Sequence, residues 1–310
     1  MKKHLFYSLF VIIILLGAGY LKRSKEVLSY IENEKTEDTV QQAMAALVEE
    51  DDNLVGTVVK IGKEDANLYS EASNTSEKIA EINRGELVEL QEVMDQWYQV
   101  TTNDGDIGYV SQSDSLLIER TIKLIPHSLA EATIVLNPGH GGDDTGALSN
   151  SGWIYEKDVT LETAEIIKAA LEEQGSTVIL TRDADITEDL AEVVKISNEN
   201  QADLFISLHY DSSENMNEAT GTTTYYYYET YGDLADTVNE ALATSLPLEN
   251  RGVTYGNFQV LRENTQPALL LELGYMNSDY DLAIFNTEEY QTTVANAIIE
   301  GLTTYFQSAN

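Results

Sequence analysis

The chain has 310 residues, of which 43% are hydrophobic and 23% are charged. This length fits about two domains, and the apolar content is enough to build packed cores. Eighteen Lys and Arg against 53 Asp and Glu give a net charge of −35. This charge excludes ordinary nucleic-acid binding, because an acidic surface repels phosphate. Cysteine is absent and only four histidines are present, so any metal site must use histidine and carboxylate ligands.

The first 25 residues are predicted to form a cytoplasmic tip and a transmembrane anchor. Residues 5–21 carry no charge, lie at the short end of what spans a bilayer, and have lysine on both sides. A cleavable signal peptide is the alternative, but residues 17–19 are a poor version of the small-residue cleavage site. We therefore expect an uncleaved, single-pass helix in the cell membrane. The flanking positive charges are nearly balanced and do not set its orientation.

Residues 26–52 are acidic and contain neither Gly nor Pro, which predicts a helical spacer. Residues 53–120 change to short alternating apolar runs, with a hairpin turn at residues 103–105, and predict a small all-β barrel. This segment resembles a bacterial SH3-type domain in its Asn-Leu-Tyr, Arg-Gly-Glu, Trp-Tyr-Gln-Val and Gly-Tyr-Val sequences. Such domains commonly occur in cell-wall enzymes, and the resemblance implies that this one binds a wall polymer or a protein. Trp97 and Tyr98 fit a pair in the barrel core at least as well as a ligand platform.

After a connector at residues 121–131, residues 132–310 alternate between strand and helix patterns. Uniformly apolar strands are expected at 133–137, 177–181, 204–208 and 268–273, with a short strand at 258–261. Helices are expected between them and at the C-terminus, where apolar residues recur at 3.6-residue spacing. Strands that are apolar on both faces need cover on both faces. We therefore predict an α/β domain with a mostly parallel sheet and helices on both of its faces.

Polar ligand types stand where these strands end. His140 lies in a glycine-rich turn after the first strand, His209 ends the strand at 204–208, and Glu272 lies inside an apolar strand. Glu156 precedes the first helix, where Asp143, Asp144 and Asp158 are alternatives. Two histidines and one carboxylate are a typical catalytic zinc set. Each residue alone is also compatible with a structural hydrogen bond, although a charged Glu272 in an apolar strand needs compensation.

The combination of motifs resembles a known family. The resemblance rests on the motifs IVLNPGHGG, Glu-Lys-Asp at 156–158, Thr-Arg-Asp at 181–183, FISLH, Arg-Gly-Val at 251–253, Val-Leu-Arg at 260–262 and PALLLELG. In this order they resemble the zinc-dependent N-acetylmuramoyl-L-alanine amidases of the third amidase family, over about residues 132–306. The resemblance implies that His140, Glu156 and His209 bind Zn²⁺. It also implies that Glu272 is the catalytic acid/base.

Three positions depart from the family pattern. Asn137 stands where Asp is usual, Asp211 stands where Asn is usual, and Val193 stands where Arg is often found. Asn137 and Asp211 are expected to lie around the metal ligands and to modify them. Arg251 and Arg262 are candidate substrate-binding residues, with structural ion pairs an equal alternative.

The resemblance implies a peptidoglycan hydrolase that cleaves the amide between the lactyl group of N-acetylmuramic acid and L-alanine. Together with the anchor, it implies a membrane protein whose catalytic domain faces the cell wall. A zinc carboxypeptidase or endopeptidase is an alternative, and would need a cationic pocket for a peptide carboxylate. A wall-binding scaffold with a degenerate hydrolase domain is another. An activating membrane or wall protein is a further expected partner, and no nucleic acid is expected.

Overall fold

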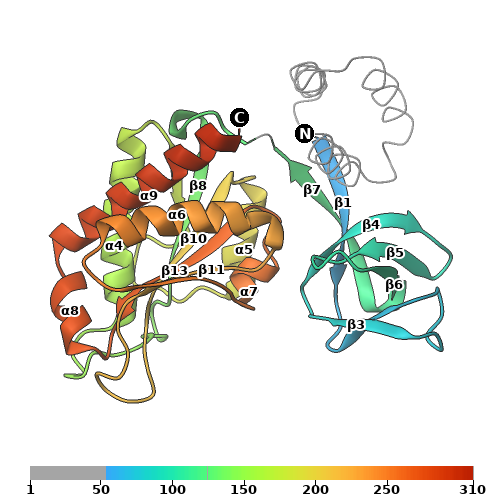
Figure 1. Ribbon diagram of the computed structural model, residues 1–310, viewed down its shortest axis with the longest axis horizontal. Coiled ribbons are helices and arrows are strands. Elements are labelled where there is room, and N and C mark those ends of the chain that lie inside the picture. Colours follow the sequence, from blue (N-terminus) through green and yellow to red (C-terminus); the bar gives the residue numbers. More distant parts are fainter. Residues whose placement is uncertain (1–53, 124, 310) are drawn as a thin grey trace. The chain divides into compact units, whose positions relative to one another are not determined.

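The computed structural model describes residues 54–123 and 125–309, which form two compact units separated at residue 124 (Figure 1). The predicted anchor and spacer, residues 1–52, lie outside these ranges. Within the described ranges, no helix combines the length and apolar character that a membrane crossing requires. The anchor therefore stays a prediction.

The first unit is all-β. Its strands form one sheet in the order β3-β2-β6-β5-β4-β1-β7. The strands are β1 Leu54–Ile61, β2 Ala66–Tyr69, β3 Lys78–Ile82, β4 Leu87–Val93, β5 Trp97–Thr101, β6 Ile107–Ser111 and β7 Ser115–Ile122, with a 3₁₀ turn at Gln112–Asp114. All pairs are antiparallel. The predicted hairpin turn joins β5 to β6, and there Gly105 donates its N–H to the carbonyl of Thr102 at a φ of 87°.

The structure separates the two aromatic residues of β5. Tyr98 is buried in the core with Val59, Leu68 and Val100. Trp97 points to the other side of the strand, where it is partly exposed and makes an edge contact with Tyr69 at 5.6 Å between ring centroids. Only Tyr98 is therefore a core residue, and the pair is not one structural unit.

The second unit is α/β with a six-stranded mixed sheet in the order β12-β11-β13-β10-β8-β9. Its strands are β8 Thr133–Pro138, β9 Thr177–Leu180, β10 Leu204–Asp211, β11 Thr222–Tyr226, β12 Asn250–Tyr255 and β13 Ala268–Tyr275. Its helices are α4 Glu156–Glu173, α5 Leu190–Glu199, α6 Gly232–Ser245, α7 Gln259–Arg262, α8 Asp279–Phe285 and α9 Glu288–Ala309, with 3₁₀ turns at Leu129–Glu131 and Glu229–Tyr231.

The sheet is mostly parallel as predicted, with four parallel pairings, and it is mixed because β11 runs antiparallel to β13. The chain enters β11 from β10 through a loop instead of a crossover helix, and this reverses the strand direction. The strand expected at 258–261 is instead helix α7, because a short apolar run fits either structure.

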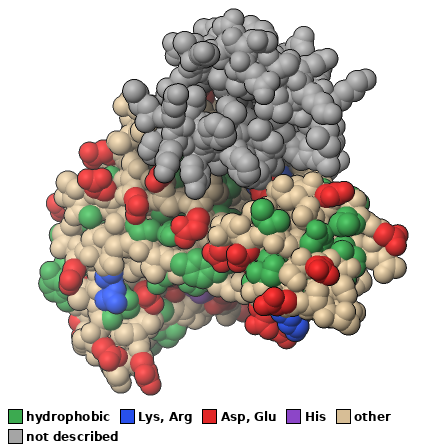
Figure 2. Space-filling view, turned by 45° about the vertical axis from the view of Figure 1, so that its right-hand side comes forward, with side chains coloured by type: hydrophobic (Ala, Val, Ile, Leu, Met, Phe, Trp, Pro, Cys, Tyr) green, Lys and Arg blue, Asp and Glu red, His purple; other side chains and the backbone are tan. Residues whose placement is uncertain are grey.

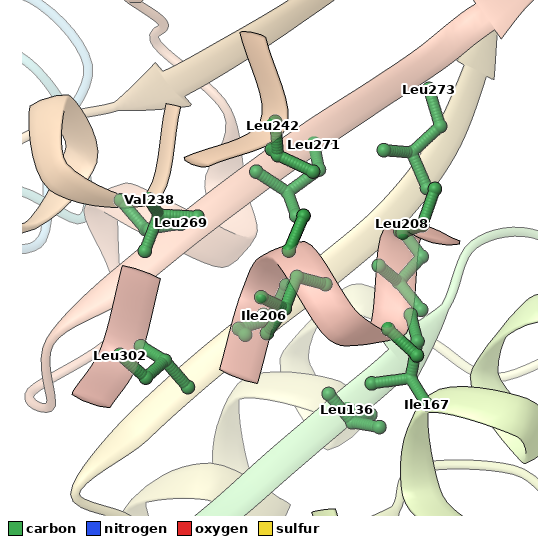
Figure 3. Packing of buried hydrophobic residues seen from close by; sticks show 14 of the residues in the cluster. Leu136, Ile167, Ile206, Leu208, Val238, Leu242, Leu269, Leu271, Leu273 and Leu302 are labelled. Carbon is green, nitrogen blue, oxygen red and sulfur yellow. The ribbon is translucent and has the colours of Figure 1, made fainter. Parts of the chain in front are cut away.

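One face of the sheet carries the main core. Leu136 of β8, Ile206 and Leu208 of β10, and the odd-numbered leucines of β13 point to this side. Helices α4, α6 and α9 cover it with Ile167, Val238, Leu242 and Leu302 (Figures 1 and 3). Because strand side chains alternate, the neighbouring residues Asn137, His209 and Glu272 point to the opposite face, beside which α5 and α7 pack together. The site residues therefore share one face of the sheet.

Leu302 offers a test of this core. It is fully buried, whereas Thr304 lies two residues further along α9 and is exposed. We expect Leu302→Ala to lower the free energy of unfolding by about 2–5 kcal/mol, because it removes buried methyl groups and leaves a cavity. Thr304→Ala should change it by less than about 0.5 kcal/mol. Urea denaturation followed by circular dichroism measures both; equal effects would contradict the packing described.

Candidate metal centre and active site

Three predicted ligands converge at the carboxyl ends of β8 and β10. His140 follows β8, Glu156 is the first residue of α4, and His209 lies on β10. The Nε2 atom of His140 lies 3.1 Å from Oε2 of Glu156, and Nδ1 of His209 lies 2.9 Å from Oε1 of the same carboxylate. One ligand atom from each residue falls within 4.8 Å of the other two. The set therefore offers two imidazole nitrogens and a carboxylate oxygen to a single cation.

Glu156 is buried, with 3% of its surface exposed, and its carboxylate is held by backbone groups. Oε2 accepts from the N–H of Ala147 at 2.8 Å, and Oε1 accepts from the N–H of Tyr210 at 3.0 Å. Burial raises the pKa of Glu156, but the hydrogen bonds and charges of His140 and His209 outweigh burial and hold that pKa well below its usual range. The carboxylate is therefore charged and fixed in position.

His140 is oriented from its other side by Asp144. The Nδ1 atom of His140 lies 2.8 Å from Oδ2 of Asp144, which leaves Nε2 to face Glu156. Burial lowers the pKa of His140, but Glu156 and Asp144 outweigh burial and raise that pKa to about 9. A carboxylate on the second nitrogen is the usual support of a ligating histidine. This role of Asp144, which was an alternative to Glu156 in the sequence, was not predicted; its position four residues after His140 was the available signal.

The backbone around the histidines is specialised for close approach. His140 itself has a φ of 63°, in the left-handed region that few residues other than glycine adopt. At Gly139, a Cβ atom would lie 2.2 Å from Cε1 of His209. At Gly146, a Cβ atom would lie 2.5 Å from Oε2 of Glu156. Glycine at these positions leaves the space that the ligand side chains occupy.

Glu272 stands beside His209. The two residues pair in register where β13 runs parallel to β10. The Oε2 atom of Glu272 is buried and accepts no hydrogen bond in the described part of the chain. Burial, together with the charges of Glu156 and Asp211, raises the pKa of Glu272 well above its ordinary value. The raised pKa and the free oxygen suit Glu272 to hold and release a proton.

A pocket of about 390 Å³ connects these residues with the face covered by α5 and α7. Its lining combines His140, His209 and Glu272 with apolar side chains from α5, α7 and β13. No Lys or Arg from the described ranges contributes to it. The lining residues are Asn137, Gly139, His140, Asp144, Thr187, Glu188, Leu190, Val193, His209, Phe258, Gln259, Val260, Leu270 and Glu272.

The two arginines that the sequence suggested for substrate binding are not part of this lining. The guanidinium of Arg251 lies over the ring of Tyr275, 5.5 Å from its centroid, and donates to the carbonyl of Thr220. Arg262 donates to Oδ1 of Asn257 on the loop before α7. Their substrate role stays a prediction that this geometry does not favour.

The structure also shows the contacts of the three residues that depart from the family pattern. Asn137 donates to Oγ1 of Thr181 at 2.9 Å and accepts from Oγ of Ser207 at 2.7 Å, so it joins neighbouring strands and bonds to neither imidazole. Asp211 accepts from the N–H of Ser212, and its charge acts on Glu272 and Tyr275. Val193 is buried and lines the pocket.

Arg182 is a further supporting residue, and in the sequence it is part of the Thr-Arg-Asp motif at 181–183. Its buried guanidinium donates to the carbonyls of Pro138 and Gly139, each at 3.0 Å, and to that of Lys157 at 2.8 Å. These bonds tie the end of β8 to the start of α4. Arg182 therefore fixes the two segments that carry His140 and Glu156.

These features define an α/β enzyme domain with a candidate metal-ligand set at its strand ends, preceded by an all-β domain. The sequence matches the N-acetylmuramoyl-L-alanine amidase family over residues 134–304 and the bacterial SH3 domain family over residues 64–115. The chain belongs to this amidase family.

The chain is similar to other amidases over different shares of its length. It is 36% identical over 247 residues to the probable cell wall amidase LytH of Staphylococcus saprophyticus, covering 78% of this chain and 82% of that protein. The catalytic domain of the amidase CwlV from Bacillus (Paenibacillus) polymyxa is 35% identical, with a TM-score of 0.54 over 56% of this chain and 97% of that one. The amidase AmiC2 of Nostoc punctiforme is 36% identical, with a TM-score of 0.54 over 57% and 98%.

Two glycines test the geometry around Glu156. Gly146 and Gly152 both have positive φ, 62° and 74°, but only at Gly146 would a Cβ meet Glu156 and His140. Gly146→Ala should therefore lower the free energy of unfolding by about 1–3 kcal/mol more than Gly152→Ala, since the backbone strain is common to both and the overpacking is not. Denaturant unfolding of the two variants measures the difference. Equal losses would show that the close contact at Gly146 is unimportant.

Proposed function

We propose that the chain is a zinc-dependent N-acetylmuramoyl-L-alanine amidase acting on peptidoglycan. The bond cleaved is the amide between the lactyl group of N-acetylmuramic acid and L-alanine of the stem peptide. The observation that carries this proposal is the convergence of His140, Glu156 and His209, with Glu272 beside them, in a chain of this amidase family.

The donor set fits zinc. Two imidazole nitrogens and one carboxylate oxygen suit Zn²⁺, and leave a coordination position open for chemistry. Asp144 supports the first imidazole in the way expected of a ligating histidine. When bound, zinc would polarise the scissile carbonyl and lower the pKa of a water molecule.

Glu272 carries the proton transfers of the proposed reaction. Its free, buried Oε2 belongs to a residue of the pocket lining, and burial raises the pKa of Glu272, which favours holding a proton. It accepts a proton from the attacking water and returns it to the nitrogen of L-alanine as the C–N bond breaks. The products are a lactyl carboxylate and a stem peptide with a free amine.

The geometry favours an amidase over a carboxypeptidase. Recognition of a terminal carboxylate needs a nearby cation, but within the described ranges no Lys or Arg lines the pocket. A non-catalytic scaffold is also disfavoured, because His140, Glu156 and His209 lie together and Glu272 pairs with His209.

We also propose that residues 1–25 anchor the chain in the membrane as a single pass, with residues 26–52 as an acidic spacer. The SH3 domain within residues 53–120 and the catalytic domain within 132–310 then lie on the cell-wall side, joined by residues 121–131. The uncharged stretch at 5–21 and the cell-wall relatives support this placement. A membrane or wall protein that activates the enzyme is part of the same proposal.

Removal of His209 tests the metal centre. We expect the purified full chain to bind about one zinc ion, and His209→Ala to weaken zinc binding by at least about 100-fold, because one of three ligands is lost. His127→Ala is the matched control, since His127 is exposed and outside the ligand set. Equilibrium dialysis with metal analysis measures the affinity. Unchanged zinc binding in His209→Ala would overturn the ligand assignment.

Glu272→Gln tests the acid/base role. It keeps the shape of the side chain but removes proton transfer, so turnover should fall about 10²–10⁴-fold while zinc remains bound. The matched control is Glu249→Gln, at an exposed carboxylate. Mass spectrometry of digested peptidoglycan measures release of stem peptides with a free N-terminal L-alanine. Shortened stems with the lactyl amide intact would instead identify a peptidase.

A further inference from the structure

Glu188 is a carboxylate of the pocket lining that the proposed reaction leaves without a role. Glu188 lies on the loop between β9 and α5 and contributes to the same lining as Glu272. Its Oε2 atom is buried and has no hydrogen-bond partner in the described part of the chain. The proposed proton transfers do not use this residue. A desolvated acceptor oxygen at a pocket wall is costly unless a ligand supplies a donor.

Glu188 is held by a chain of side-chain hydrogen bonds. Ser207 donates to Oδ1 of Asn137, Nδ2 of Asn137 donates to Oγ1 of Thr181, and Thr181 hydrogen-bonds to the Glu188 carboxylate. The hydroxyl of Thr181 has a single proton, and Asn137 leaves it free for Glu188. An Asp at position 137 would compete for that proton. Asn137 is therefore the residue type that fits a series of hydrogen bonds ending at the Glu188 carboxylate.

Among the described residues, no Lys or Arg of the pocket lining neutralises the Glu188 carboxylate. Its neighbours in the lining include Leu190, Val193 and Val260, and the other carboxylates of the pocket are Asp144 and Glu272. Burial raises the pKa of Glu188 although the Thr181 bond and the charge of Arg182 oppose this. Arg182 directs its donors to backbone carbonyls and to Thr160, not to Glu188.

We propose that Glu188 is a specificity-determining residue that favours stem peptides bearing neutral amide N–H donors over those bearing a free carboxylate at the same position. The inference rests on the proposed function. A carboxamide donates to the free oxygen of Glu188, whereas a carboxylate has no proton to donate and is repelled by the acidic pocket. The ligand class is therefore a glycopeptide that presents a neutral amide N–H donor to the pocket, and an α-carboxamide on the second stem residue is the probe for the experiment.

The test is a competition between two soluble disaccharide pentapeptides that differ only in an α-carboxamide or α-carboxylate on the second stem residue. With the zinc-loaded full chain, mass spectrometry of both products gives the ratio of the two kcat/KM values. We expect a preference of about tenfold for the amidated substrate, and a fall to about twofold or less in Glu188→Gln.

Asp189→Asn is the matched control. It removes the same charge from the adjacent residue, which is exposed and does not line the pocket. Its ratio should equal that of the wild type, because a solvated charge is screened. A Glu188→Gln ratio equal to that of the wild type would overturn the inference, and so would an equal fall in Asp189→Asn.

Binding separates this inference from the proposed reaction. In the Glu272→Gln background, calorimetry should show the same preference in Kd for the amidated glycopeptide, and its loss on adding Glu188→Gln. A binding preference that is absent or unaffected overturns the role of Glu188. A binding preference without cleavage by the wild-type chain would instead overturn the amidase proposal and leave the specificity role intact.

Discussion

The catalytic unit depends on one buried anion, the carboxylate of Glu156. It accepts backbone N–H groups from the β8–α4 loop and from β10, and it faces both imidazoles. A buried carboxylate without such partners would be strongly destabilising, so its four contacts and the local fold require one another. Arg182 complements it by binding carbonyls of the β8 end and of α4. Backbone N–H groups thus converge on the Glu156 anion and backbone carbonyls on the Arg182 cation, and together they hold the irregular segment between β8 and α4.

The sequence predicts those parts of the catalytic unit for which a short stretch of residues indicates burial or position in the sheet. Apolar strands such as 204–208 and 268–273 are buried on both faces, so their composition alone indicates an α/β sheet. The carboxyl ends of parallel strands meet at one edge, so His140 and His209 were expected to lie together. Glu272 was identified because a charge in an apolar strand requires an explanation.

The remaining features depend on contacts that no local pattern encodes. The antiparallel direction of β11 follows from its partner β13, nearly fifty residues away in sequence. Helix α7 has four residues, too few for a periodicity to distinguish it from a strand. Asn137 was assigned to the surroundings of the metal ligands by its sequence position. Its real partners, Thr181 and Ser207, are brought to it only by the pairing of β8 with β9 and β10.

The charge of the chain limits how substrate reaches this site. Acidic side chains are scattered over the face shown in Figure 2, and the pocket lining repeats that sign with Asp144, Glu188 and Glu272. Long-range attraction of an anionic wall polymer is therefore unfavourable, and salt screens it within about 10 Å in any case. Binding must come from short-range hydrogen bonds and apolar contacts inside the pocket, helped by whatever holds the enzyme near the wall. The role proposed for Glu188 fits this condition, because a carboxylate acceptor favours a neutral N–H donor and disfavours the anions that the surface already repels.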